Sequence, residues 1–272
     1  MVSEAPKRSG LRGGGSMCTL SVITRNDGYL LAMNRDEKIA RGAGELPEIH
    51  RLNGTTAVYP SDAGGAWIAA NEYGVTLALL NWNDVVQPEP DTGKVRSRGG
   101  IIPILAGAPS ITGLQSAFAA FNLDGIRPFR LVAVFPSERA IAEWGWDSSQ
   151  LTFQTLSWHS RHWFSSSLTD RQAEILRGAV CRDAQHQLDA GSASWLRRLH
   201  ASHASGPGPF SLCVHRDDVK TLSYSEITVA PERIQMGHFR GSPCAMPQLN
   251  WIEIQRVYCA GPAVTSFSGS AV

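Results

Sequence analysis

Short apolar blocks separated by turn signals characterise the first third of the chain. Residues 19–24 and 29–33 are rich in β-branched and apolar side chains, and an Asp-Gly step at residues 27–28 separates them. Such a step between two apolar runs is a strong local signal for a hairpin. The same arrangement recurs over residues 67–80, with a turn at residues 71–74. The pattern therefore predicts two β-hairpins.

The rest of the chain mixes helical and strand patterns. Helices are predicted over residues 101–105, 110–121, 169 to about 188, and 194–200. Strands are predicted over residues 129–135, 140–146, 151–156, 210–215, 220–229 and 233–239. Residues 37–51 and 85–99 show no clear period and are predicted to be loops. Because strands and helices do not alternate as in a βαβ chain, the order favours an α+β fold with antiparallel sheets.

Composition narrows the class of protein. A length of 272 residues suits one large domain or two small ones, and 43% hydrophobic residues allow a substantial core. The formal net charge of +1 gives no electrostatic case for nucleic acid or an anionic membrane. No apolar run is long enough to span a bilayer. The five cysteines form no C-x-x-C pair, which favours a reducing, cytoplasmic setting.

The chain divides into three parts. Residues 1–16 contain a Gly-Gly-Gly run and no apolar segment, so they are predicted to be a disordered extension and not a secretory signal. Residues 17–255 form the predicted domain, and residues 256–272 are predicted to be a disordered tail. We favour Met17 as the initiator because nothing before it could pack; if Met1 is retained, Cys18 lies inside the chain.

The first hairpin brings chemistry together at its open end. Cys18 is expected beside Asn34, Arg35 and Asp36, so a thiol meets an amide, a guanidinium and a carboxylate. A nearby cation favours the thiolate, which is the nucleophilic form. If Met17 is removed, Cys18 also carries an α-amino group with a pKa of about 7.7–8.0, close to about 8.5 for the thiol. The amine could then act as the general base for the thiol of its own residue.

Met-Cys at residues 17–18, a hairpin, and Asn-Arg-Asp-Glu at residues 34–37 together resemble the NRDE family, also called the transport and Golgi organisation family. That family resembles a branch of the N-terminal-nucleophile (Ntn) hydrolases, near the choloylglycine hydrolases and penicillin V acylases. The resemblance implies a four-layer αββα sandwich with two antiparallel sheets. It also implies that Cys18 matches the nucleophile and that Arg35 and Asp36 match the catalytic Arg and Asp.

A second block strengthens the resemblance. Asp-x-Gly-Gly-x-Trp at residues 62–67 and the strand ending at Asn81 are similar to the second block of the family. The related acylases place an oxyanion-hole Asn at this strand end, which implies that role for Asn81. Taken alone, Asn81 would more often begin a turn, and only beside Cys18, Arg35 and the Gly-Gly-x-Trp block are the two interpretations even. The candidate substrate-binding residues are Asn34, Trp67, Trp82, Arg98 and Ser166.

Two polar residues of the acylases are missing at the aligned positions. A second Asn is replaced within residues 163–170 by serine, Ser166 being our candidate, and a late Arg has no counterpart within residues 206–215. The eight histidines show no H-E-x-x-H or similar spacing, so neither a metal site nor a cofactor is expected. His215, His238 and Cys244 could still bind a ligand such as haem.

Three functional readings remain open on the sequence. The first is a hydrolase that acts on the amide or acyl bond of a small molecule, with Cys18 as nucleophile. The second is a non-catalytic carrier or trafficking protein for haem, acyl-CoA or lipid on the same fold, because a fold does not fix a function. In the third, Cys18 is an ordinary strand residue, and Arg35 and Asp36 form a structural ion pair.

Overall fold

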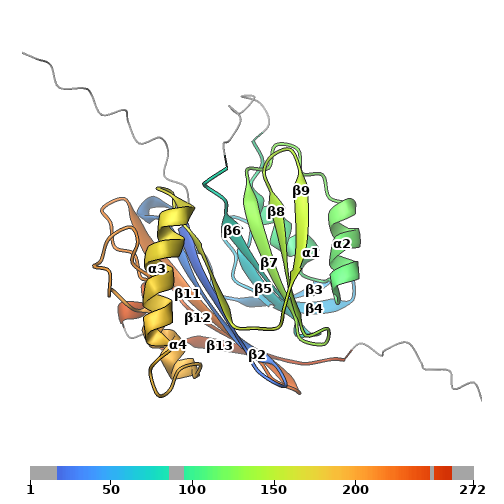
Figure 1. The fold of residues 1–272 in the computed structure, drawn as a ribbon. Coiled ribbons are helices and arrows are strands. Elements are labelled where there is room, and N and C mark those ends of the chain that lie inside the picture. Colours follow the sequence, from blue (N-terminus) through green and yellow to red (C-terminus); the bar gives the residue numbers. More distant parts are fainter. Residues whose placement is uncertain (1–16, 86–94, 246–247, 259–272) are drawn as a thin grey trace, which may run out of the picture.

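The computed structural model describes residues 17–85, 95–245 and 248–258, and every structural statement below concerns these ranges (Figure 1). The predicted extension at residues 1–16 lies outside them. So do residues 86–94 of the predicted loop and residues 259–272 of the predicted tail.

Two antiparallel sheets form the centre of the molecule. The first sheet has the strand order β10-β1-β2-β11-β12-β13. Its strands, in chain order, are β1 (Met17–Thr24), β2 (Tyr29–Lys38), β10 (Arg161–Ser165), β11 (Val219–Val229), β12 (Arg233–Phe239) and β13 (Asn250–Gln255).

The second sheet follows the chain without a crossover, in the order β3-β4-β5-β6-β7-β8-β9. Its strands are β3 (Glu48–Leu52), β4 (Thr55–Tyr59), β5 (Ile68–Asn71), β6 (Thr76–Asn81), β7 (Phe129–Phe135), β8 (Ala140–Trp146) and β9 (Leu151–Leu156).

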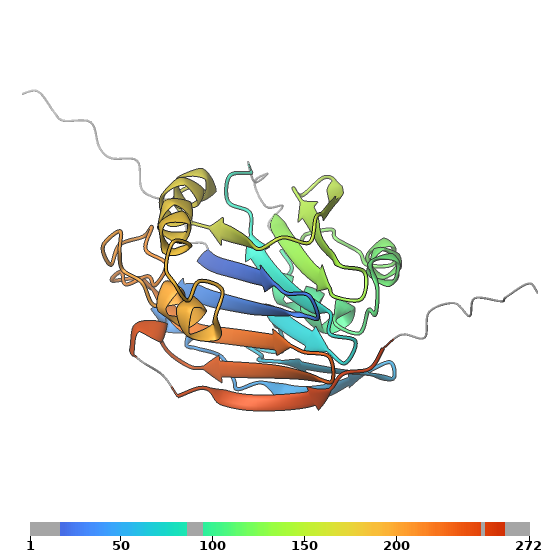
Figure 2. The ribbon, with the colours of Figure 1, turned by 60° about the horizontal axis from the view of Figure 1, so that its bottom comes forward.

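Helices cover the outer face of each sheet (Figures 1 and 2). Helices α3 (Asp170–Ala184) and α4 (Ala193–His200) share an apolar cluster with the first sheet, and α1 (Ile101–Leu105) and α2 (Ile111–Ala119) share another with the second sheet. A third cluster fills the space between the sheets. The layers are therefore helix, sheet, sheet and helix, so the predicted four-layer αββα sandwich is confirmed. Three short 3-10 helices are η1 (Ile39–Arg41), η2 (Arg98–Gly100) and η3 (Pro243–Ala245).

Local sequence explains where the longer helices begin. The Ser110 hydroxyl accepts a hydrogen bond from the backbone N–H of Gly113, and the Thr169 hydroxyl accepts one from Gln172. Each side chain satisfies a donor that the first helical turn leaves unpaired. Helix α3 ends at Ala184, earlier than the predicted end near residue 188. No helix of the described ranges is long and apolar enough to cross a membrane.

Both predicted hairpins form, but several strand assignments were incomplete or wrong. Residues 210–215 form no strand; His215 makes a single bridge to Lys220. β12 pairs only with residues 224–229 of β11, so the start of β11 has an open edge beside this segment. The Val214 N–H, however, donates to the Thr221 hydroxyl and not to the backbone, so no ladder forms beyond the bridge. Four strands were not predicted: β3, β4, β10 and β13. Strand β3 begins inside the segment that was predicted as a loop over residues 37–51.

Candidate active site

Strand β2 presents its Asn-Arg-Asp-Glu segment to two different layers. Successive side chains of a strand point to opposite faces. Arg35 and Glu37 line a cleft together with Cys18, which pairs with Arg35 in the register. Asn34 and Asp36 point the other way, towards the layer of α3 and α4, where their partners lie. The tetrapeptide therefore supplies two residues to the cleft and two to the support behind it.

The cleft has a volume of about 270 Å³. Cys18 lines it from β1, and Asn81 lines it from the end of β6. Trp67 and Arg98 also line it, so residues from both sheets and from the loop before α1 meet here. Among the predicted site residues, the structure thus gathers Cys18, Arg35, Asn81, Trp67 and Arg98 around one space.

Arg35 is held rigidly in the wall of the cleft. Its guanidinium donates hydrogen bonds to Asp62 Oδ2 at 2.7 Å and to the carbonyl of Gly42 at 3.1 Å. Its Cζ also lies 4.6 Å from the ring centroid of Trp67, a cation–π distance. Burial lowers the pKa of Arg35, while Glu37 and Asp62 raise it. The side chain has little freedom to move, and its charge is shared with two carboxylates.

The thiol of Cys18 is not activated by its surroundings alone. Burial raises its pKa to about 12, and the nearby Asp36 adds to the rise, while Arg35 lowers it. The predicted influence of Arg35 is present, but burial and Asp36 outweigh it. Cys18 is only 4% exposed. A nucleophilic role for this thiol therefore requires a base that removes its proton.

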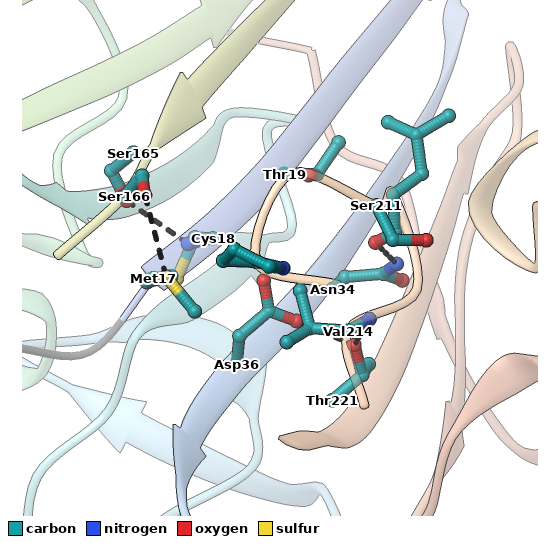
Figure 3. A network of polar contacts seen from close by, with 12 residues as sticks. Met17, Cys18, Thr19, Asn34, Asp36, Ser165, Ser166, Ser211, Val214 and Thr221 are labelled. Carbon is teal, nitrogen blue, oxygen red and sulfur yellow. Dashed lines mark hydrogen bonds between the residues drawn. The ribbon is translucent and has the colours of Figure 1, made fainter. Parts of the chain in front are cut away.

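The backbone around Cys18 is fixed from both sides (Figure 3). Its N–H donates a hydrogen bond of 2.9 Å to the hydroxyl of Ser165 on β10. Its carbonyl accepts a hydrogen bond of 3.3 Å from Arg177 on α3. Met17 is fully buried, and its Sδ accepts a hydrogen bond of 3.5 Å from the Ser166 hydroxyl. The position of the nucleophile candidate is thus set by β10 and α3.

Asp36 is buried behind the cleft, opposite Met17 in the register of β1 and β2. Its Oδ1 accepts a hydrogen bond of 2.6 Å from the Thr221 hydroxyl, and Oδ2 lies 3.6 Å from the Arg177 guanidinium. Burial raises the pKa of Asp36 to about 7, although Arg177 and Thr221 both lower it. The expectation that Asp36 shares one space with Arg35 does not fit this geometry, because adjacent strand residues face apart.

Three predicted substrate-binding residues lie outside the cleft. The side-chain amide of Asn34 donates to the carbonyls of His200 and Leu212 at 2.9 and 2.7 Å and ties β2 to the helix layer. Ser166 contacts Met17, as described above. Trp82 packs its ring against Gly145 of β8. None of the three is among the residues that line the cleft.

The cleft also contains charged residues that the sequence reasoning missed. Five arginines line it: Arg35 and Arg98, which were predicted, and Arg41, Arg96 and Arg127, which were not. Two carboxylates, Glu37 and Asp62, offset them, which leaves a balance of five minus two, or three positive charges. Burial, together with the like charge of Arg127, lowers the pKa of Arg98 to about 10. Crowding of unpaired positive charge of this kind favours an anionic ligand.

Glycines allow two segments of the wall to meet. The backbone N–H of Ala66 donates to the carbonyl of Gly99 at 2.9 Å. A Cβ atom on Gly65 would lie 2.8 Å from the Cα of Gly99, closer than real contacts allow. The absence of a side chain at Gly65 therefore allows the backbone to approach residue 99, next to Arg98 in the wall of the cleft.

Comparison with known proteins gives the family of the chain and supports its fold. The family model described as Transport and Golgi organisation 2 matches residues 17–180. Penicillin V acylase from Agrobacterium tumefaciens is similar in structure, with a TM-score of 0.52, 12% identity and coverage of 87% of this chain and 86% of that chain. The Caenorhabditis elegans ortholog of N-acylethanolamine-hydrolyzing acid amidase gives a TM-score of 0.53, 9% identity and coverage of 77% and 92%. A search of curated proteins gave no match. At these identities the likeness shows the Ntn-hydrolase fold.

Proposed function

The chain belongs to the Transport and Golgi organisation 2 family, and from this membership and the geometry of the cleft we propose that it is an Ntn-type hydrolase of amide or acyl bonds. Cys18 is the nucleophile. The observation that carries the proposal is that Cys18, Arg35 and Asn81, which come from three different strands, line one cleft. A purely structural cysteine would not require an amide donor and a fixed guanidinium beside it.

The missing base is the α-amino group of Cys18. The thiol has a pKa of about 12 while the chain continues to Met17, so it stays protonated at neutral pH. Removal of the residues before Cys18 would create an amine at the atom that now donates to Ser165. Asp36 lies opposite Met17 in the register and is suited to hold this amine when it is protonated. The proposal therefore requires that Cys18 become the first residue.

The reaction follows from these positions. The amine takes the proton of the thiol, and Sγ attacks the carbonyl carbon of the substrate. The amide of Asn81 and a backbone N–H donate to the oxyanion that forms. The carbon–nitrogen or carbon–oxygen bond then breaks, and the leaving group takes the proton from the ammonium. Water, deprotonated by the same amine, cleaves the acyl-thioester and restores Cys18.

The charge of the cleft narrows the substrate. Five arginines against two carboxylates favour a small acylated molecule that also carries a carboxylate or phosphate group. After burial, the like charge of Arg127 contributes most to the lowered pKa of Arg98. An anion between them would relieve that repulsion.

Within the described residues, four cysteines form no disulfide, which is consistent with the proposed cytoplasmic setting.

The test compares two forms of the protein: one that begins at Cys18 and one in which residues 1–17 are retained. Each is mixed with an activated acyl donor that carries a carboxylate, and acylation is followed by intact mass. We expect acylation at Cys18 to be faster by about 10²–10⁴ in the form that begins at Cys18, because only that form has the base. Equal rates in the two forms would overturn the proposal.

Matched variants identify the residues involved. Cys18→Ala should abolish the acylation, whereas Cys181→Ala, a buried cysteine on α3, should leave it unchanged. Asn81→Ala should slow it by about 10²–10³, the usual cost of one oxyanion donor. Acylation that persists in Cys18→Ala would contradict the assigned nucleophile.

A carrier is the second candidate function, and the arginines of the cleft favour it as well. Haem and acyl-CoA both carry anionic groups that such a cleft could bind. Titration with each ligand separates the two functions. A carrier binds ligand stoichiometrically, keeps the affinity in Cys18→Ala and releases no hydrolysis product. A hydrolase turns acyl-CoA over and stops when Cys18 is replaced.

A further inference from the structure

Four side chains of types that bind metals meet at a place outside the cleft. His203, Cys213, His215 and Cys244 each offer one ligand atom, and these atoms lie within 4.8 Å of one another. None of the four residues lines the cleft. Three segments contribute them: the loop after α4, the segment before β11, and η3.

Two distances within this cluster are close to the edges of a tetrahedral metal site. Nε2 of His215 lies 3.5 Å from Sγ of Cys213 and 3.2 Å from Sγ of Cys244. Zinc binds sulfur at about 2.3 Å and imidazole nitrogen at about 2.0–2.1 Å, so a tetrahedron around it has a sulfur–nitrogen edge of about 3.6 Å. His203 completes the group, with its ring centroid 5.0 Å from that of His215.

The donor set selects the type of metal. Two thiolates and two imidazoles are the ligands of structural zinc sites, whereas calcium and magnesium require oxygen ligands. Four protein ligands fill a tetrahedral shell and leave no open position for a substrate. Cys213 is buried and the other three are partly buried, so the ion would be shielded and still accessible to loading.

We propose that His203, Cys213, His215 and Cys244 bind one zinc ion in a structural site. The ion stabilises a part of the chain that has no hydrogen-bonded helix or sheet to hold it together. Residues 201–218 contain no strand or helix beyond the single bridge of His215, and zinc joins them to η3.

The zinc site is connected to the support of the cleft. Val214 stands between two of the ligands, and its N–H donates to the hydroxyl of Thr221 at 2.8 Å. That hydroxyl in turn donates to Asp36 at 2.6 Å. Zinc therefore holds Val214 in the position that orients Thr221 towards Asp36. The proposal does not depend on the hydrolase function, because the ligands and their distances stand by themselves.

A disulfide between Cys213 and Cys244 is the competing interpretation. It would use the two sulfur atoms and leave both histidines without a role. Intact mass separates the two states, since a disulfide removes two hydrogen atoms and excludes zinc. Protein that carries this disulfide and takes up no zinc after reduction would overturn the proposal.

The test measures metal content in the full chain, purified without a histidine tag. Elemental analysis should give about one zinc per chain. Cys213→Ala and Cys244→Ala should each reduce this to less than about a tenth. Cys181→Ala and His186→Ala remove the same residue types elsewhere and should retain the ion. Variants of the cluster that keep a full equivalent of zinc would refute the assignment.

Two measurements on the unaltered chain keep the test decisive if the variants fail to fold. Reaction of the thiols with a mercurial should release about one equivalent of zinc, detected with a chromogenic chelator. Replacement of zinc by cobalt should give the intense visible absorption of a tetrahedral thiolate site. Absence of both the release and the absorption, after reduced protein has been incubated with each metal, would overturn the proposal.

Discussion

Replacement of Arg177 by methionine tests how the helix layer supports the candidate nucleophile. The Arg177 side chain is fully buried on α3. It donates to the carbonyl of Cys18 at 3.3 Å, to the hydroxyl of Thr19 at 2.9 Å and to the carbonyl of Pro209 at 3.1 Å. It also lies 3.6 Å from Asp36, which is fully buried as well. Methionine fills much of the same volume but removes every one of these polar contacts.

The size of the effect follows from the ion pair. Removal of one partner of a buried pair costs about 3–5 kcal/mol, because the remaining charge is buried without compensation. One kcal/mol shifts the Tm by about 2–4 °C in a chain of this size class, so we expect a decrease of roughly 6–20 °C. Without Arg177 the pKa of Asp36 rises further above about 7. A raised pKa favours the protonated carboxyl in the folded state, so the loss should be smaller at about pH 5 than at about pH 8.

The assay is urea unfolding at both pH values, with Arg182→Met as the control. Arg182 lies on the same helix but is exposed, so its replacement should change the free energy of unfolding by less than about 0.5 kcal/mol. The double variant that adds Asp36→Asn to Arg177→Met should recover part of the loss at the higher pH, because neither member of the pair then leaves an uncompensated charge. A loss equal to that of the control, or one independent of pH, would refute the reasoning.

Three further predictions concern the two faces of β2 and the wall of the cleft. Asn34→Ala should lower the free energy of unfolding by about 1–3 kcal/mol, measured with urea, and leave the rate of thiol acylation unchanged. Gly65→Ala should weaken binding of an anionic ligand, measured by titration, by about tenfold or more because its Cβ would meet Gly99, whereas Gly100→Ala has open space and should not. The stability of the wild type relative to Asp36→Asn should fall as the pH rises from about 4 to about 7, because the folded pKa is raised to about 7. Urea unfolding across this range would contradict the assignment if the difference were constant.

Local patterns predicted much of the fold, and long-range pairing accounts for most of what they missed. The hairpin of β1 and β2 was predictable because its apolar runs and its turn are contiguous. Strand β10 was not, since it pairs with β1 from a position more than 130 residues away. Residues 210–215 look like a strand in isolation. They form none because their backbone N–H groups bond elsewhere: that of Cys213 donates to the carbonyl of Ser202, and that of Val214 to the Thr221 hydroxyl. These contacts depend on the tertiary structure.

The sequence predicted which residues belong to the site better than it predicted how they are arranged. Cys18, Arg35 and Asn81 were named from motifs, and they meet in the cleft. The alternation of strand residues, if applied to residues 34–37, would have separated Asp36 from Arg35 and added Glu37 to the cleft. The loop arginines could not be found in this way. Arg41, Arg96 and Arg127 reach the cleft from loops and from η1, whose positions depend on tertiary contacts.

The alternation of β2 also explains why chemistry and support can be tested separately. The cleft face carries the groups that could contact a substrate, whereas the helix face carries Asn34 and Asp36, whose partners are protein atoms. Asp36 accepts a hydrogen bond from the Thr221 hydroxyl, which in turn accepts one from Val214, the residue between two ligands of the proposed zinc site. Asp36 also forms an ion pair with Arg177, which donates a hydrogen bond to the carbonyl of Cys18. Loss of zinc should therefore change the rate at Cys18 through position alone. Such a change would lower the acylation rate without altering the affinity for an anionic ligand in the cleft, because the arginines of the cleft are not part of this chain of contacts.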